Sequence, residues 1–165
     1  MKRYYGKYRG KVEGNIDPLN QGRLRVSVAS VFGKGNMNWA MPCVPFAGAG
    51  LGFLFLPPTG ANVWVEFEEG NSQKPIWTGC FWGAEEALPL QPLPIHKVLK
   101  TAAFELSIME PPENSPPSAA IVEIKTASGF SIKIDPLEVT IGNGIASIVL
   151  RGPTVVINKD GLEVT

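Results

Sequence analysis

The chain has 165 residues, 44% of them hydrophobic, and its 15 Lys and Arg residues balance 15 Asp and Glu residues. No segment reaches the roughly 18 consecutive apolar residues that a transmembrane helix needs. A net charge of zero disfavours nucleic acid as the main partner, because nucleic-acid binding usually requires a basic surface. The basic N-terminal residues are not followed by an apolar core, so we expect no signal peptide and a protein made in the cytoplasm.

The first half of the chain has the alternation and the turn residues of short β-strands. Apolar residues at positions 63, 65 and 67 alternate with Trp64, Glu66 and Glu68, which is typical of a half-buried strand. Five segments follow such patterns, at residues 8–14, 23–30, 39–45, 63–68 and 75–79. Five short antiparallel strands in residues 1–83 predict a closed barrel of the OB type.

Residues 84–120 interrupt this pattern. Two proline-rich stretches, residues 84–94 and 110–117, indicate stiff and extended connections. The apolar spacing of residues 98–109 between them fits a helix or a pair of strands. We therefore expect a proline-rich linker with one short element.

Residues 121–165 have a different sequence pattern. Strands of roughly five residues recur at intervals of roughly eight to ten, separated by turns such as Asn143-Gly144 and Gly152-Pro153. A weak repeat of strand and turn is typical of a stack of strands, and one such layer cannot form a core alone. We expect another copy of the chain, and another protein at the C-terminal end, to cover it. The fold class is therefore predicted to be all-β.

Few residues are of types and spacings suited to catalysis or metal binding. Cys43 and Cys80 lack a metal-binding spacing, and we expect two buried free thiols, while His96 lies alone in the proline-rich segment. The acidic run at residues 66–69 invites a glycosidase interpretation, which needs two carboxylates in one cleft. Its alternation with core positions instead predicts a solvated strand face. We expect no enzyme, no catalytic or metal-binding residue, and no cofactor.

The tryptophans offer an alternative function, because aromatic side chains on OB barrels can stack on the bases of single-stranded nucleic acid. The four are Trp39, Trp64, Trp77 and Trp82. The chain has no basic excess to follow a phosphate backbone, and tryptophans beside Pro and Gly in a small barrel are more often core or interface anchors. Binding of nucleic acid is therefore the less favoured interpretation.

An ordered set of short motifs resembles the spike proteins of contractile injection systems. The motifs are GKV at residues 10–12, DP at 17–18, GRLRVSV at 22–28, WAMPCVPFAG at 39–48, LPPTGANVWVEFEEG at 56–70 and PIWTG at 75–79. This group comprises phage baseplate assembly protein V, the valine–glycine repeat spike of type VI secretion and the spike of extracellular phage tail-like injection particles. The resemblance implies a homotrimer, with three OB barrels (residues 1–83) above an intertwined triple-stranded β-helix or prism (residues 121–165).

The resemblance also implies a function. Such a protein is a structural, membrane-puncturing spike and a hub component in the baseplate of a contractile phage tail-like particle, with transient contact to a target membrane. The chain lacks the inserted lysozyme-like domain and the long terminal β-helix of some members, and it lacks the terminal His-x-His pattern that holds iron in some short phage spikes. Peptidoglycan cleavage and a metal tip are therefore not implied. A trimeric tail-fibre-like adhesin is the first alternative, and an OB-fold nucleic-acid-binding protein is the second.

Three sets of residues are expected to form the contacts of such a spike. The trimer core would contain Ile132, Ile134, Val139, Ile141, Ile148, Leu150, Val155 and Ile157, with Ser131, Lys133, Asp135 and Glu138 facing outward. A trimeric baseplate hub would contact Tyr4, Tyr5 and Tyr8 at the barrel end, with a disordered tail as the alternative. A small conical tip protein of the proline–alanine–alanine–arginine (PAAR) type would contact Leu162, Val164 and Thr165.

Overall fold

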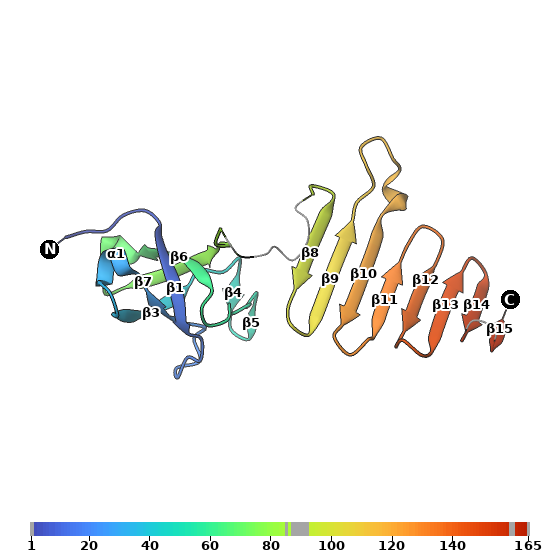
Figure 1. The fold of residues 1–165 in the computed structure, drawn as a ribbon, viewed down its shortest axis with the longest axis horizontal. Coiled ribbons are helices and arrows are strands. Elements are labelled where there is room, and N and C mark those ends of the chain that lie inside the picture. Colours follow the sequence, from blue (N-terminus) through green and yellow to red (C-terminus); the bar gives the residue numbers. More distant parts are fainter. Residues whose placement is uncertain (1, 85, 87–92, 159–160, 165) are drawn as a thin grey trace. The chain divides into compact units, whose positions relative to one another are not determined.

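The computed structural model describes residues 2–84, 86, 93–158 and 161–164, and it divides into two compact units, Met1–Ala87 and Leu88–Thr165 (Figure 1). The principal sheet of each unit is separate, and strands make up most of the regular structure. The predicted all-β class is therefore confirmed. None of the described helices is long and apolar enough to cross a membrane.

The first unit contains a closed five-stranded barrel in the order β1-β2-β3-β7-β6. Its strands are β1 (Tyr8–Gly14), β2 (Leu24–Ser27), β3 (Met37–Pro42), β6 (Asn62–Phe67) and β7 (Pro75–Cys80). Strand β3 runs parallel to β7, with Met41 opposite Ile76, whereas the other neighbouring strands are antiparallel. The expectation of an entirely antiparallel barrel is therefore wrong. Alternation locates a strand but not its direction, which here depends on the route of residues 43–61.

Apolar side chains from alternate strand positions fill the barrel. The buried set is Val12, Leu24, Val26, Val28, Ala40, Val63, Val65, Phe67 and Trp77. The indole N–H of Trp77 donates a hydrogen bond to the carbonyl oxygen of Gly22 at 3.2 Å, which satisfies its polar atom. A Cβ at Gly10 would lie 2.9 Å from the carbonyl oxygen of Ser27, so glycine is required where β1 approaches β2.

Short elements connect the barrel strands. They are α1 (Ala29–Phe32), the hairpin of β4 (Ala47–Gly48) and β5 (Leu51–Gly52), and the 3-10 helix η1 (Glu68–Gly70). The strand expected at residues 23–30 is shorter, because β2 ends at Ser27 and α1 follows it.

Asp17 organises the loop between β1 and β2. Its carboxylate accepts hydrogen bonds from the backbone N–H groups of Leu19, Gln21 and Arg23, and it forms an ion pair with the Arg23 side chain at 2.7 Å. The Arg23 side chain lowers the pKa of Asp17 well below its usual range, and the backbone donors act in the same direction against the effect of desolvation. This buried ion pair fixes the position at which β2 begins.

The second unit is a single sheet of eight strands in which sequence neighbours are also spatial neighbours (Figure 1). The strands are β8 (His96–Lys100), β9 (Phe104–Met109), β10 (Ile121–Thr126), β11 (Ser131–Ile134), β12 (Val139–Gly142), β13 (Ser147–Arg151), β14 (Thr154–Ile157) and β15 (Leu162–Val164), with the 3-10 helix η2 (Pro117–Ala119) before β10. All the pairings are antiparallel.

This sheet begins earlier in the chain than the sequence suggested. Residues 84–120, expected to be a linker with one short element, contain both β8 and β9, and His96 is the first residue of β8. In β9, Leu106 lies opposite Ile124 and Ile108 lies opposite Val122 of β10. The apolar spacing of residues 98–109 therefore belongs to a strand pair, which was one of the two alternatives.

Candidate assembly surface

Two rows of aliphatic residues cross the sheet of the second unit on one face. Residues directly opposite each other in antiparallel strands point to the same face, so the registers define each row. The first row contains Leu99, Leu106, Ile124, Ile132, Ile141, Ile148, Ile157 and Leu162. The second row contains Ile108, Val122, Ile134, Val139, Leu150 and Val155. We call these two rows the apolar face.

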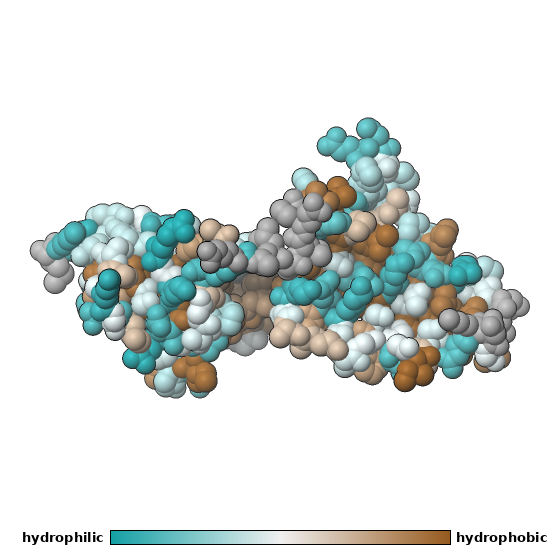
Figure 2. Space-filling model, viewed as in Figure 1, coloured by the Kyte–Doolittle hydropathy of each residue, from teal (hydrophilic) through white to brown (hydrophobic). Residues whose placement is uncertain are grey.

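The apolar face has no cover within one chain. No described residue of the second unit is buried, and every side chain of the buried core lies in the barrel. Ile141 is 44% exposed and Ile134 is 46% exposed, although each lies between paired residues of two neighbouring strands. A sheet needs a second layer to bury its apolar side. On the side of the molecule that Figure 2 shows, apolar residues reach the surface of this unit among polar ones.

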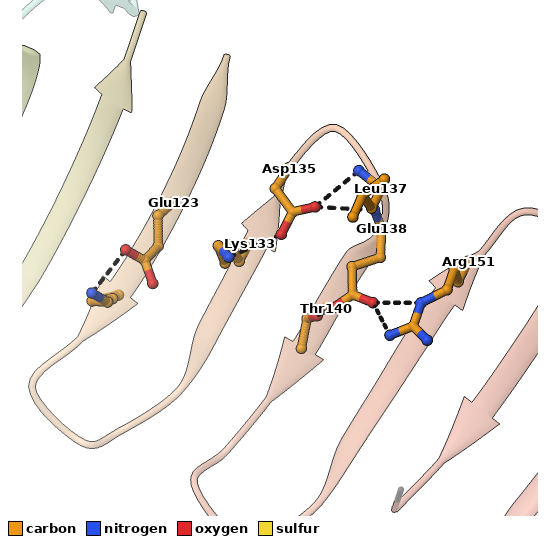
Figure 3. Close-up of polar contacts among 8 residues, drawn as sticks. Glu123, Lys133, Asp135, Leu137, Glu138, Thr140 and Arg151 are labelled. Carbon is orange, nitrogen blue, oxygen red and sulfur yellow. Dashed lines mark hydrogen bonds and ion pairs between the residues drawn. The ribbon is translucent and has the colours of Figure 1, made fainter. Parts of the chain in front are cut away.

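The opposite face of the sheet carries charged residues that pair with one another (Figure 3). Lys133 forms an ion pair with Asp135 at 2.9 Å, and the Nε–H of Arg151 donates a hydrogen bond to Glu138 at 2.8 Å. Lys133 lowers the pKa of Asp135, helped by the backbone N–H groups of Leu137 and Glu138, and Asp135 in turn raises the pKa of Lys133. The side chain of Glu138 likewise raises the pKa of Arg151.

Further pairs continue this charged face toward the start of the sheet. Lys125 pairs with Glu123 at 2.8 Å, and Lys100 pairs with Glu105 at 2.6 Å, where it lowers the pKa of Glu105. Exposed ion pairs add little stability, but placing many charges between protein layers would carry a large desolvation penalty. The charged face is therefore suited to water, and the apolar face to contact with another protein layer.

The structure places all eight residues expected in a trimer core on the apolar face. They are Ile132, Ile134, Val139, Ile141, Ile148, Leu150, Val155 and Ile157, and their burial between copies remains a prediction. Ser131 and Lys133 alternate with Ile132 and Ile134 and therefore lie on the other face. Sequence reasoning missed the neighbouring members of both rows in β8, β9 and β10. The alternation of residues 104–109 and 121–126 was the signal that could have identified them.

The three tyrosines expected to contact a hub differ in their surroundings. The rings of Tyr4 and Tyr8 pack against Phe67, with centroids 5.9 Å and 5.4 Å from its ring, so they form part of the barrel wall. Tyr5 is 73% exposed and lies over Gly70. Among the three, Tyr5 therefore has the largest area free for another protein.

The residues expected to contact a tip protein are only partly described. Leu162 is 54% exposed in β15, the outer strand of the sheet in the described part of the chain. Val164 lies opposite Val155 in register, but its side chain is not among those described. Thr165 lies outside the described residues.

The tryptophans do not form a shared platform. Trp77 is buried, Trp39 lies under the guanidinium of Arg23 at 5.1 Å, and Trp64 packs against Phe81 with their ring centroids 4.6 Å apart. Trp82 alone is largely exposed. These roles are those of core and surface-packing residues rather than of a base-stacking row.

The structure also shows where the acidic run of residues 66–69 and the two cysteines lie. Glu66 pairs with Lys7 at 2.8 Å and Glu68 pairs with Lys74 at 3.3 Å, so both carboxylates lie on the barrel surface beside lysines. Cys43 and Cys80 are exposed, so the expectation of buried thiols is wrong. Cys43 directly follows β3, and Cys80 is the last residue of β7.

Comparison with known protein families gives a match for each unit. Residues 8–82 match the type VI secretion system/phage-baseplate injector OB domain, and residues 96–163 match the phage baseplate V C-terminal trimerisation domain. A search of curated proteins finds no match. The first match agrees with the closed barrel, and the second assigns the uncovered sheet to a domain that forms homotrimers. The chain therefore belongs to the phage baseplate V family, the structural spike proteins of phage baseplates and type VI secretion systems.

Proposed function

We propose that three copies of this chain form the axial spike of a contractile phage tail-like particle, and that contraction drives this spike through a target membrane. The observation that carries the proposal is the eight-stranded sheet in which no described residue is buried. One such sheet has no second layer over its apolar face, and the match to a trimerisation domain supports identical copies as that layer.

Three apolar faces turned toward a common axis would form one continuous core. Each row contributes a side chain from almost every strand, so three copies place aliphatic groups at every level along the axis. Burying such side chains contributes about 1.5–3 kcal/mol each relative to full exposure. A core packed in this way has low compressibility, which suits a protein whose task is to transmit force, and the charged faces remain in water.

The proposal is tested in particles that lack the native chain and are supplied with a variant. Ile141→Asp places a carboxylate on the apolar face, whereas Ser131→Asp adds the same charge to the other face, opposite Lys125. We expect Ser131→Asp to restore assembled particles that release dye from target membrane vesicles, and Ile141→Asp to fail. Full membrane leakage with Ile141→Asp, or none with the wild-type chain in contracted particles, would contradict the proposal.

At the barrel end, we propose docking on a trimeric baseplate hub through the exposed ring of Tyr5. Support comes from its exposure and from the tendency of tyrosine to occur at interfaces. Tyr5→Ala should reduce incorporation into particles without changing the barrel, since the backbone oxygen of Tyr5 still accepts the hydrogen bond from Tyr8. Deleting residues 1–7 is a weaker test because it also removes Tyr4 from the barrel wall. Unchanged incorporation of Tyr5→Ala would exclude this contact.

At the other end of the sheet, we propose that a small conical PAAR-type protein binds against β15. Leu162 is exposed on this outer strand, and proteins usually cover exposed strand edges and apolar groups with another element or a partner. Purified wild-type trimer should retain such a tip protein in a pull-down, and Leu162→Asp should not. Equal retention by both would remove β15 from the contact.

A further inference from the structure

The barrel unit also has an exposed apolar surface, separate from its buried core. Residues 46–56, here called the apolar loop, contain only Phe, Leu, Ala and Gly, so no side chain in the loop is charged or able to hydrogen-bond. All of its large side chains are exposed, from 37% at Leu56 to 74% at Leu51; they are Phe46, Leu51, Phe53, Leu54, Phe55 and Leu56. An apolar patch of this kind on a small barrel marks a contact surface.

The apolar loop has a defined, hydrogen-bonded conformation. Strands β4 and β5 pair within it, and the N–H of Phe53 donates a hydrogen bond to the carbonyl oxygen of Phe46 at 3.1 Å. The rings of Phe53 and Phe55 lie with centroids 4.9 Å apart. At its end, the side chain of Asn15 donates a hydrogen bond to the carbonyl oxygen of Pro57. The loop therefore holds its aromatic groups outward in a defined shape.

Other parts of the barrel surface mix paired charges with separate exposed apolar residues such as Ile16 and Met41. Lys7 pairs with Glu66 and Lys74 pairs with Glu68, so burying those regions would desolvate ions. The apolar loop carries no such penalty. It is therefore the region of the barrel best suited to lie against another protein layer.

The apolar loop lies at the end of the barrel where β7 finishes. Because β3 runs parallel to β7, the two strands end on the same side of the barrel, where Cys43 donates its N–H to the carbonyl oxygen of Trp77. The apolar loop follows β3, and the connection follows β7 (Figure 1). Fifteen residues separate Cys80 from His96, a span of at most about 50 Å. In a trimer, each barrel is thus tethered within this distance of its own sheet, which raises its effective concentration relative to the other two barrels.

We propose that, in the assembled trimer, the apolar loop of each barrel packs against the same loop of the neighbouring copies. The proposal rests on the homotrimer described above. Cyclic symmetry makes the three uncharged loops equivalent, so loops that meet at the threefold axis would each bury an aromatic pair against another without any partner of different chemistry. Tethering allows even a weak contact of this kind to form.

The test uses the full chain with Cys43→Ser and Cys80→Ser, so that one introduced cysteine reports on one surface. Leu51→Cys lies in the apolar loop, whereas Lys34→Cys lies between α1 and β3, at the other end of the barrel (Figure 1). After copper–phenanthroline oxidation we expect Leu51→Cys to give disulfide-linked dimers on a non-reducing gel, since two of three copies can join, and Lys34→Cys to give none.

A second substitution separates packing from simple proximity. Adding Phe55→Ser to Leu51→Cys should cause loss of the linked dimer, whereas adding Tyr5→Ser, an exposed aromatic over Gly70, should not. Sedimentation should show a trimer for every variant, because none of these residues lies in the second unit.

Each other outcome overturns the proposal in a distinguishable way. If a sedimenting trimer of Leu51→Cys links no better than Lys34→Cys, the loops do not meet, although the homotrimer stands. If unlinked trimer floats with phosphatidylcholine vesicles and Phe55→Ser abolishes flotation, the loop binds lipid instead. If Phe55→Ser prevents incorporation into particles without any linking, another baseplate protein covers the loop. A monomer in sedimentation overturns the homotrimer and this proposal together.

Discussion

Replacing Ile141 tests directly whether the apolar face joins copies of the chain. Ile141 lies opposite Ile132 on one side and Ile148 on the other, and 44% of its surface is exposed in a single chain. Full burial contributes about 1.5–3 kcal/mol, so covering the exposed fraction contributes about 0.7–1.3 kcal/mol per copy. Ile141→Ala should therefore weaken a trimer by about 2–4 kcal/mol, or about 30- to 1000-fold in its association constant.

The assay is sedimentation velocity over a dilution series, with circular dichroism to establish that each variant is folded. Ile141→Asp should be more severe than Ile141→Ala, because three carboxylates would be buried without partners near one axis. Ser131→Asp is the matched control, since it places the same charge beside Lys125 on the opposite face. A folded Ile141→Asp chain that remains trimeric at the same concentrations as wild type would show that the apolar face does not join the copies.

The other predictions concern the barrel and the charged face. Gly70 (φ +72°) and Gly60 (φ +88°) both have left-handed backbones, so alanine at either should cost about 1–2 kcal/mol of stability. The cost should be larger at Gly70, where a Cβ would lie 3.1 Å from the backbone nitrogen of Tyr4. Thermal unfolding followed by tryptophan fluorescence measures both costs, and equal costs would contradict a close contact at Gly70. Because the pKa of Asp17 is lower in the folded chain than the unfolded value of about 3.9, its stabilising effect is present above that pH and is lost as the pH falls below it. Asp17→Asn should therefore reduce the loss of barrel stability below about pH 4, as measured by the melting temperature against pH, and an unchanged profile would contradict this. Arg151→Ala should leave the trimer mass unchanged, because its ion pair with Glu138 lies on the charged face; dissociation on a sedimentation run would be the contrary result.

Local pattern was sufficient to locate most strands. The bounds of β1 agree with residues 8–14, and the alternation of residues 63–67 gives β6 with its buried Val63 and Val65. The two-residue period is a direct consequence of strand geometry, so it can be read without knowledge of the fold. The same period predicted that Ile132 and Ile141 each lie on the apolar side of their own strand, and the register places them opposite each other.

The features that the sequence did not predict depend on contacts between distant segments. The parallel pairing of β3 and β7 follows from how residues 43–61 cross the barrel, which no local pattern encodes. Strands β8 and β9 were hidden because their apolar spacing also fits a helix, and only pairing with β10 decides between the two. The exposure of residues 53–56 was also missed, since an apolar run gives no indication of whether its partner belongs to the same chain.

A density map of the assembled protein that resolves side chains in the second unit would test the trimeric spike most directly. We expect three copies around one axis, with Ile132, Ile141 and Ile148 of every copy facing that axis and Lys133 and Arg151 facing solvent. A map in which the charged face lies inside, or in which the apolar face of a single copy is covered by a different protein, would contradict this expectation.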